Sequence, residues 1–172
     1  MAKKRELGPF EDEMIRLRLL ERDDLPLTMA WRNQDSIRRW FFHSNILEIE
    51  QHTQWFEQYL TRDDDFVFIA EDARNGYRPF GQVSLYHIDW EARRAEFGRL
   101  FIGEAFARGR GLGLAVTRQA LVIAFQHLDL NEVYLEVFAE NVAARNIYLK
   151  AGFLEQGQTN NIIQMNILRS LP

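Results

Sequence analysis

Apolar and polar residues alternate near the start of the chain, and helical spacing follows. Residues 14–20 alternate aliphatic and arginine side chains, and this period of two predicts a half-buried strand. Asp23 and Asp24 come next and are suited to cap a helix that runs to about Trp31. Apolar residues at helical spacing predict a second helix over residues 48–60.

Three apolar runs follow at short intervals. Residues 66–70, 81–88 and 95–102 each predict a strand, and the polar segments 74–77 and 89–92 between them predict turns. Consecutive strands joined by short polar turns are typical of an antiparallel meander.

The pattern then changes to alternating helices and strands. A glycine-rich segment precedes a long apolar helix over residues 114–128, and Gly152 is suited to cap the C-terminus of a later helix. The remaining predicted elements are a strand over 132–138, a helix over 142–150 and strands over 153–155 and 162–168. The order β-α-α-β-β-β-α-β-α-β-β predicts an α+β, layered fold, with a mixed, mostly antiparallel sheet flanked by helices. We expect a polar tail over residues 1–13 and a single domain over 14–172.

Composition narrows the class of protein. A chain of 172 residues with 47% hydrophobic and 27% charged residues has the usage of an ordinary globular domain. The formal net charge of −4 gives no basic surplus for nucleic acid. The absence of cysteine excludes disulfides, thiolate nucleophiles and cysteine-bound zinc. No apolar run approaches a membrane span or a secretory signal. We therefore expect a cytoplasmic protein without a metal site.

The segment 108–113 reads Arg-Gly-Arg-Gly-Leu-Gly and lies where a predicted strand passes into a predicted helix. A helix start leaves backbone N–H groups unpaired and can bind an anion, and glycine lets the backbone approach phosphate oxygens closely. The spacing fits neither a Walker A loop nor a dinucleotide fingerprint. Taken alone, the segment is equally compatible with phosphate binding and with a simple turn.

A second motif covers residues 141–153. Asn141 is suited to cap the predicted helix, and Ala144, Ile147 and Tyr148 share one of its faces. A tyrosine on this face can donate its hydroxyl proton to a leaving group. An isolated tyrosine is more often a core residue with a hydrogen-bonded hydroxyl, so this motif alone leaves both readings open.

Together, Arg-x-x-Gly-x-Gly at 108–113 and Asn-x-x-Ala-x-x-Ile-Tyr-x-Lys-x-Gly-Phe at 141–153 resemble the GNAT superfamily of acetyl-CoA-dependent N-acetyltransferases. The resemblance extends over residues 14–168. It implies that acetyl-CoA lies between two splayed strands and that an amine attacks the thioester directly. The alternative to an enzyme is a family member that binds acetyl-CoA as a sensor and does not catalyse transfer.

The resemblance also assigns site residues. Backbone amides of 108–114 would hold the pyrophosphate, and backbone groups of 100–102 would pair with the pantetheine arm. Tyr148 would be the general acid. Glu96 is our choice of general base, with Glu136 and His87 as alternatives. The residues assigned to acetyl-CoA are Leu100, Phe101, Ile102, Arg108, Gly109, Arg110, Gly111, Leu112, Gly113, Leu114, Asn141 and Asn146.

The class of acceptor amine is inferred mainly from segments in the N-terminal half of the chain. The segments 30–33, 37–40 and 50–55 resemble nucleotide-linked amino-sugar acetyltransferases of pseudaminic-acid-type pathways, whereas residues 86–97 resemble spermidine acetyltransferases. Ribosomal-protein N-terminal acetyltransferases share the layout. Arginines and aromatic rings suit a nucleotide sugar, and a polyamine would need the acidic residues near 48–50 and 63–65. We place the amino sugar first and the polyamine or protein N-terminus second, and a homodimer is possible. The cations and rings considered for the sugar are Trp31, Arg32, Arg38, Arg39, Trp40 and Phe42.

Overall fold

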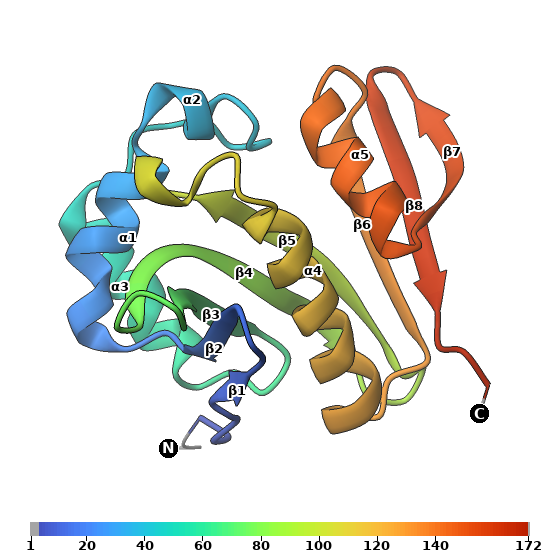
Figure 1. Ribbon diagram of the computed structural model, residues 1–172, viewed down its shortest axis with the longest axis horizontal. Helices are drawn as coiled ribbons and strands as arrows, with labels where there is room; N and C mark the ends of the chain where they lie inside the picture. Colours follow the sequence, from blue (N-terminus) through green and yellow to red (C-terminus); the bar gives the residue numbers. More distant parts are fainter. Residues whose placement is uncertain (1–3, 172) are drawn as a thin grey trace.

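The computed structural model describes residues 4–171 of the chain, and one mixed sheet with helices on both faces organises them (Figure 1). The elements in chain order are β1 (Phe10–Glu11), β2 (Ile15–Leu19), η1 (Arg22–Asp24), α1 (Leu25–Arg32), α2 (Asp35–Arg38), α3 (Ile49–Tyr59), β3 (Phe66–Asp72), β4 (Arg78–Asp89), β5 (Arg94–Ile102), η2 (Ala105–Ala107), α4 (Leu112–Val122), η3 (Ile123–His127), β6 (Glu132–Phe138), α5 (Val142–Ala151), β7 (Leu154–Thr159) and β8 (Ile162–Leu168).

The eight strands lie in the order β1-β2-β3-β4-β5-β6-β8-β7. The β5–β6 pair is parallel, and the other neighbouring pairs are antiparallel. The expected mixed, mostly antiparallel sheet flanked by helices is therefore confirmed.

Alternating side chains of β3 separate two cores. Phe66 and Phe68 belong to the large core that includes residues of α4 and α5. Val67 and Ile69 belong to a second core with Phe56 and other side chains of α1 and α3. Because successive side chains of a strand point to opposite faces, α1 and α3 cover one face of the sheet, and α4 and α5 cover the other.

The parallel pair is short. In the part of the chain that the structure describes, three residue pairs join β5 to β6, from Arg94↔Glu132 to Glu96↔Tyr134. Beyond Glu96, β5 continues to Ile102 with β4 as its ladder partner, while β6 pairs with β8. The two strands diverge from this point, as Figure 1 shows. The backbone of β5 beyond Glu96 therefore presents one edge to the space between the strands.

Two β-bulges interrupt the β4–β5 ladder beside this point. Between the pairs Ser84↔Gly98 and Gln82↔Phe101, two residues of β5 oppose one of β4, and Arg99 has a φ of 51°. Between the pairs Tyr86↔Glu96 and Asp89↔Arg94, two residues of β4 oppose one of β5, and His87 has a φ of 48°. Bulges redirect side chains, and these two lie next to the candidate site.

The strands and helices expected from residue 14 onward are present, with small differences at their ends. The short elements β1, η1, α2 and η2 were not expected. The apolar helix begins at Leu112, two residues early, and its last turn is a π-helix. No helix among residues 4–171 is long and apolar enough to cross a bilayer.

Two local expectations change. Phe10 pairs with Leu17, and Lys4 Nζ donates to the Tyr59 carbonyl at 3.0 Å, so the described part of the expected tail lies against the fold. Asp24 precedes α1 but does not cap it through its side chain, because its carboxylate accepts hydrogen bonds from Arg18.

Candidate functional site

The glycine-rich loop has the backbone of an anion site. Gly109 and Gly111 have φ values of 71° and 73°, a region that glycine enters without strain. No atom lies within 4 Å of a Cβ built on either residue. Gly111 is the N-cap of α4, and the first intrahelical hydrogen bond runs from Ala115 N to its carbonyl at 3.2 Å. The amides of Leu112, Gly113 and Leu114 precede that bond, so the helix start offers donors to a phosphate.

Both arginines of the loop are tied to other elements. Arg110 Nη1 lies 2.9 Å from Oδ2 of Asp72, a residue of β3 with no exposed surface. Arg108 Nη2 donates to Gln34 Oε1 at 2.9 Å, and Gln34 Nε2 donates to the Gly103 carbonyl. These contacts fix the loop to the sheet and to the segment between α1 and α2.

The residues expected beside the pantetheine arm lie on β5 past the divergence. Leu100 and Ile102 are half-buried against the large core. Phe101 is buried with Trp31 and Ile37. Their backbone edge toward β6 is the one left outside the ladder, so the geometry fits an added strand-like arm.

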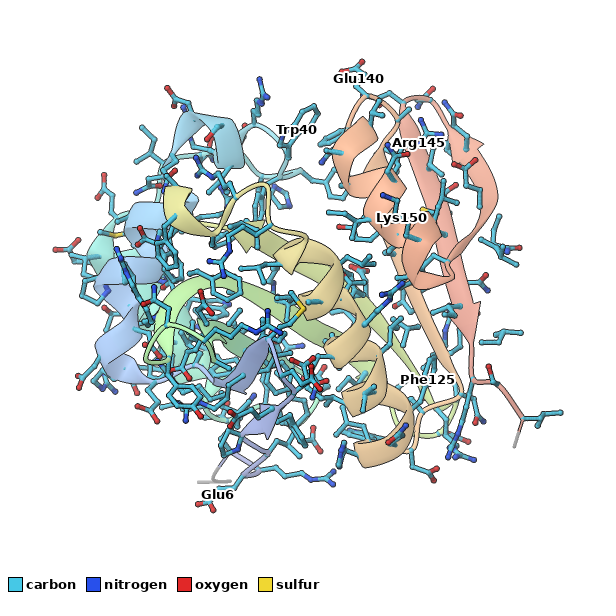
Figure 2. All side chains as sticks on the ribbon, viewed as in Figure 1. Glu6, Trp40, Phe125, Glu140, Arg145 and Lys150 are labelled. Atoms are coloured by element: carbon cyan, nitrogen blue, oxygen red, sulfur yellow. The ribbon has the colours of Figure 1, made fainter. Side chains whose placement is uncertain are left out.

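Helix α5 begins at the far side of the same gap. Asn141 Oδ1 accepts from Ala144 N at 3.3 Å and caps the helix, while Asn146 is exposed on its surface. Figure 2 places Glu140 and Arg145 near this start and Trp40 on the segment after α2. Phe42, on that same segment, packs against Phe138 at the end of β6, with ring centroids 4.8 Å apart. The N-terminal half thus touches both diverging strands.

Tyr148 lies on the buried face of α5. Its ring packs edge-on against Phe97 of β5 at 5.6 Å and lies 5.9 Å from the Phe153 ring. Burial raises the pKa of the Tyr148 hydroxyl above its usual value. The group therefore keeps its proton at neutral pH, as a general acid requires.

A cavity of about 540 Å³ lies over β4 and β5, on the side of α1 and α3. This volume is in the range of small-molecule sites. Two leucines and four phenylalanine, tryptophan or tyrosine residues line it, together with nine residues that have polar or charged side chains. The lining residues are Leu20, Thr28, Arg32, Phe41, Phe42, His43, Leu47, Gln51, His52, Trp55, Gln82, Tyr86, His87, Glu96 and Arg99.

Glu96 is the one carboxylate among the described residues that line this cavity. Its Oε1 lies 3.5 Å from Nδ1 of His87. Burial and a hydrogen bond to Glu96 raise the pKa of Tyr86. The residue chosen as general base therefore faces the cavity, at the last residue pair before β5 and β6 diverge.

Glu96 and Tyr148 approach that point from opposite faces of the sheet. Phe97, the neighbour of Glu96 in sequence, points to the other face and touches Tyr148. His87 shares the cavity with Glu96, whereas Glu136 does not line it. Glu96, the predicted base, therefore lies on the cavity side of the sheet, and Tyr148, the predicted acid, lies on the side of α4 and α5.

The Trp-Arg-Asn segment at the end of α1 has a separate task for each residue. Trp31 Nε1 donates to Glu104 at 2.9 Å, and its ring fills the space where Gly103 would carry a Cβ. Arg32 lines the cavity. Asn33 exchanges two hydrogen bonds with the backbone of Leu47, at 2.7 and 2.9 Å, and holds the cavity wall in place.

The other charges considered for the acceptor lie outside the cavity lining. Arg38 pairs with Asp35, and Arg39 is exposed over Trp40. In the acidic run, Asp64 pairs with Arg62, and buried Asp65 pairs with Arg99 at 2.9 Å. The glutamates at positions 48 and 50 do not line the cavity either.

Sequence reasoning did not single out several lining residues, including Tyr86, Gln82 and Arg99. Tyr86 is paired directly with Glu96 across the β4–β5 ladder. An antiparallel register counted back from the turn at 89–92 could have brought these two residues together.

Comparison with known proteins identifies related sequences and structures. Residues 15–154 match the model of the acetyltransferase (GNAT) domain. The spermidine N(1)-acetyltransferase of Escherichia coli K12 is 30% identical over 145 residues, which cover 84% of this chain and 75% of the relative. The putative ribosomal N-acetyltransferase YdaF of Bacillus subtilis is 28% identical over 163 residues, covering 90% and 86%.

Solved structures give the same picture. The spermidine N-acetyltransferase of Vibrio cholerae, in complex with CoA and spermine, is similar with a TM-score of 0.83 at 27% identity. The match covers 91% of this chain and 96% of that one. A dodecameric structure of the Vibrio cholerae enzyme is similar with a TM-score of 0.75 at 25% identity, covering 91% and 95%.

Proposed function

This chain belongs to the acetyltransferase (GNAT) family, and we propose that it acetylates the primary amine of a small molecule bound in the cavity over β4 and β5. The family resemblance found in the sequence is confirmed, and the chain is an acetyl-CoA-dependent N-acetyltransferase. The observation that carries the proposal is Glu96, the cavity carboxylate beside the divergence of β5 and β6.

The residues present fit acetyl-CoA, whose thioester supplies the activated acetyl group. Positive-φ glycines with open space above them and the free amides of α4 suit the pyrophosphate. The unladdered edge of β5 suits the amide-containing arm.

Two proton transfers follow from the positions of Glu96 and Tyr148. Glu96 accepts the proton that the ammonium group loses, so that the neutral amine nitrogen can bond to the acyl carbon. An amide of β5 near the Arg99 bulge donates to the oxygen on which charge develops. As the carbon–sulfur bond breaks, the Tyr148 hydroxyl protonates the departing sulfur, and the second proton lost by the nitrogen returns through solvent to the Tyr148 oxygen. No covalent bond to the enzyme is needed.

The relatives and the cavity favour different classes of acceptor amine. The relatives named for spermidine favour the polyamine, the second choice of the sequence analysis, over the nucleotide-linked amino sugar. Polyamines are therefore the first class to test. The cavity itself favours an amine that also carries negative charge, because Arg32 on its wall has no carboxylate partner among the described residues.

Thiol release from acetyl-CoA, measured against spermidine, a UDP-linked amino sugar and short peptides, tests the proposal. We expect Glu96→Gln to lower kcat/KM about 10²–10⁴-fold on the productive amine, the usual contribution of a general base. The KM for acetyl-CoA should stay unchanged. Acetyl-CoA binding without turnover on any amine would instead support the sensor.

Self-association is a further part of the proposal. β7 is an edge strand with every residue exposed, and Leu154 of β7 and Leu168 of β8 are each 64% exposed. The dodecameric relative supports a homo-oligomer as well. Light scattering on Leu154→Lys should then show a smaller particle than the unmodified protein.

A further inference from the structure

Arg32 stands out among the charged residues of the cavity wall. It is 9% exposed and lies at the end of α1, one turn after Thr28, which also lines the cavity. Residues four apart share a helix face, so α1 turns both polar groups toward the same space. Within residues 4–171, Arg32 Nη1 is shielded from solvent and has no hydrogen-bond partner.

Among residues 4–171, no carboxylate forms an ion pair with Arg32. Its Nη2 donates to the His43 carbonyl, and the guanidinium carbon lies 3.5 Å from the centre of the Phe41 ring. Burial, and then the like charge of Arg38, lower the pKa of Arg32. Burying a cation without an anion costs free energy. A bound anionic group would lower this cost for Arg32.

The second arginine of the cavity shows the contrast. Arg99 Nη1 lies 2.9 Å from Oδ1 and 3.2 Å from Oδ2 of buried Asp65. The fold therefore pairs Arg99 with a buried carboxylate, whereas Arg32 in the same cavity has no such partner in the described part of the chain. An unpaired arginine next to a ligand space is the usual means of binding carboxylate or phosphate oxygens.

We propose that Arg32 binds an anionic group of the acceptor, a carboxylate or a phosphate, so that the preferred substrate is a primary amine that also carries negative charge. The inference rests on the proposed function and adds the chemical class of the substrate. Glu96 and Arg32 then recognise the two ends of one molecule, the amine and the anion.

Matched pairs of amines test the preference. L-Lysine and cadaverine differ only by a carboxylate, and a UDP-linked amino sugar and the free amino sugar differ by the nucleoside diphosphate. We expect kcat/KM to be about 10- to 150-fold higher for the anionic member of at least one pair, the range of a charge-assisted hydrogen bond. The productive pair distinguishes a carboxylate from a phosphate.

Arg32→Gln should abolish this preference, while Arg39→Gln, which removes the same charge from an exposed site, should retain it. An unchanged KM for acetyl-CoA would show that the Arg32 variant is folded. Arg32→Lys, which keeps the charge but loses the planar fork, should retain part of the preference.

Equal rates within both pairs, unaltered by Arg32→Gln, would overturn the anion site and leave the acetyltransferase proposal standing. If no amine releases thiol, the proposed function fails on its own. Calorimetric titration of L-lysine and the UDP-linked sugar then decides the Arg32 site. Binding that Arg32→Gln removes supports it, and no binding to the unmodified protein overturns it.

Discussion

Two glycine substitutions separate backbone strain from cofactor binding. Gly111, with a φ of 73°, lies at the start of α4, and Gly76, with a φ of 60°, lies in the turn between β3 and β4. A Cβ built on either residue meets no atom within 4 Å. Alanine at each position therefore adds conformational strain without a clash, and the two sites differ in what binds next to them.

The strain is similar at the two positions. A non-glycine residue in the left-handed region costs about 1–2 kcal/mol. For a chain of this size that lowers Tm by about 2–8 °C. We expect Gly111→Ala and Gly76→Ala to fall in this range together. Gly111→Ala should in addition raise the KM for acetyl-CoA about 10- to 150-fold, because its methyl group would block a charge-assisted hydrogen bond from the loop to phosphate.

The assay is thermal unfolding of both variants beside steady-state thiol release over a range of acetyl-CoA concentrations. Gly76→Ala serves as the control for strain alone. Equal KM values for the two variants, with equal losses in Tm, would show that the loop at 108–113 does not hold the pyrophosphate.

Three further predictions concern the acid, the packing of Trp31 and a cavity histidine. Tyr148→Phe should lower kcat about 10²–10⁴-fold, and because burial raises the pKa of Tyr148, kcat of the unmodified enzyme should show no Tyr148 deprotonation through pH 9. Gly103→Ala places a Cβ 2.2 Å from Trp31 Cγ, so unfolding monitored by tryptophan fluorescence should show a loss of about 1–3 kcal/mol. Burial lowers the pKa of His52, so the unfolded chain binds more protons just below pH 6.5 and stability should fall on acidification there. Urea unfolding at pH 7.5 and 5.5 should show a smaller acid-induced loss in His52→Gln, and an equal loss would exclude His52 as the cause.

The parts of the fold that sequence reasoning predicted well have strong local patterns. β6 and β8 have the predicted ends because buried side chains alternate along them, as at Val133, Leu135 and Val137. β1 was missed because two residues carry no period, and their pairing with β2 depends on a turn. α2 is a single turn whose buried residue is Ile37, and one apolar residue cannot define a helical spacing.

The cavity wall depends on features that no local pattern contains. Glu96 and Arg99 are three residues apart on one strand, and a regular strand would point them to opposite faces. The extra residue of the bulge at Arg99, with its positive φ, brings both to the same cavity. The sequence motif therefore indicated a carboxylate on the correct strand, while the bulge decides which of its neighbours share the site.

The pairing of charged residues also cannot be predicted from local sequence patterns, and this pairing decides which substrate the cavity can bind. The sequence offered Arg32, Arg38 and Arg39 as equivalent cations and an acidic run at 63–65 as a possible polyamine pocket. Contacts between residues far apart in the sequence decide which of these charges remain available. Asp65 forms an ion pair with Arg99, 34 residues away, and is therefore not available to a substrate. What remains on the wall is one carboxylate and one arginine without a counter-ion among the described residues. A trication gains little from such a wall, whereas a molecule with one amine and one anion can pair with both groups. The amines that separate these two charges are therefore a sharper test of the acceptor than similarity to any single relative.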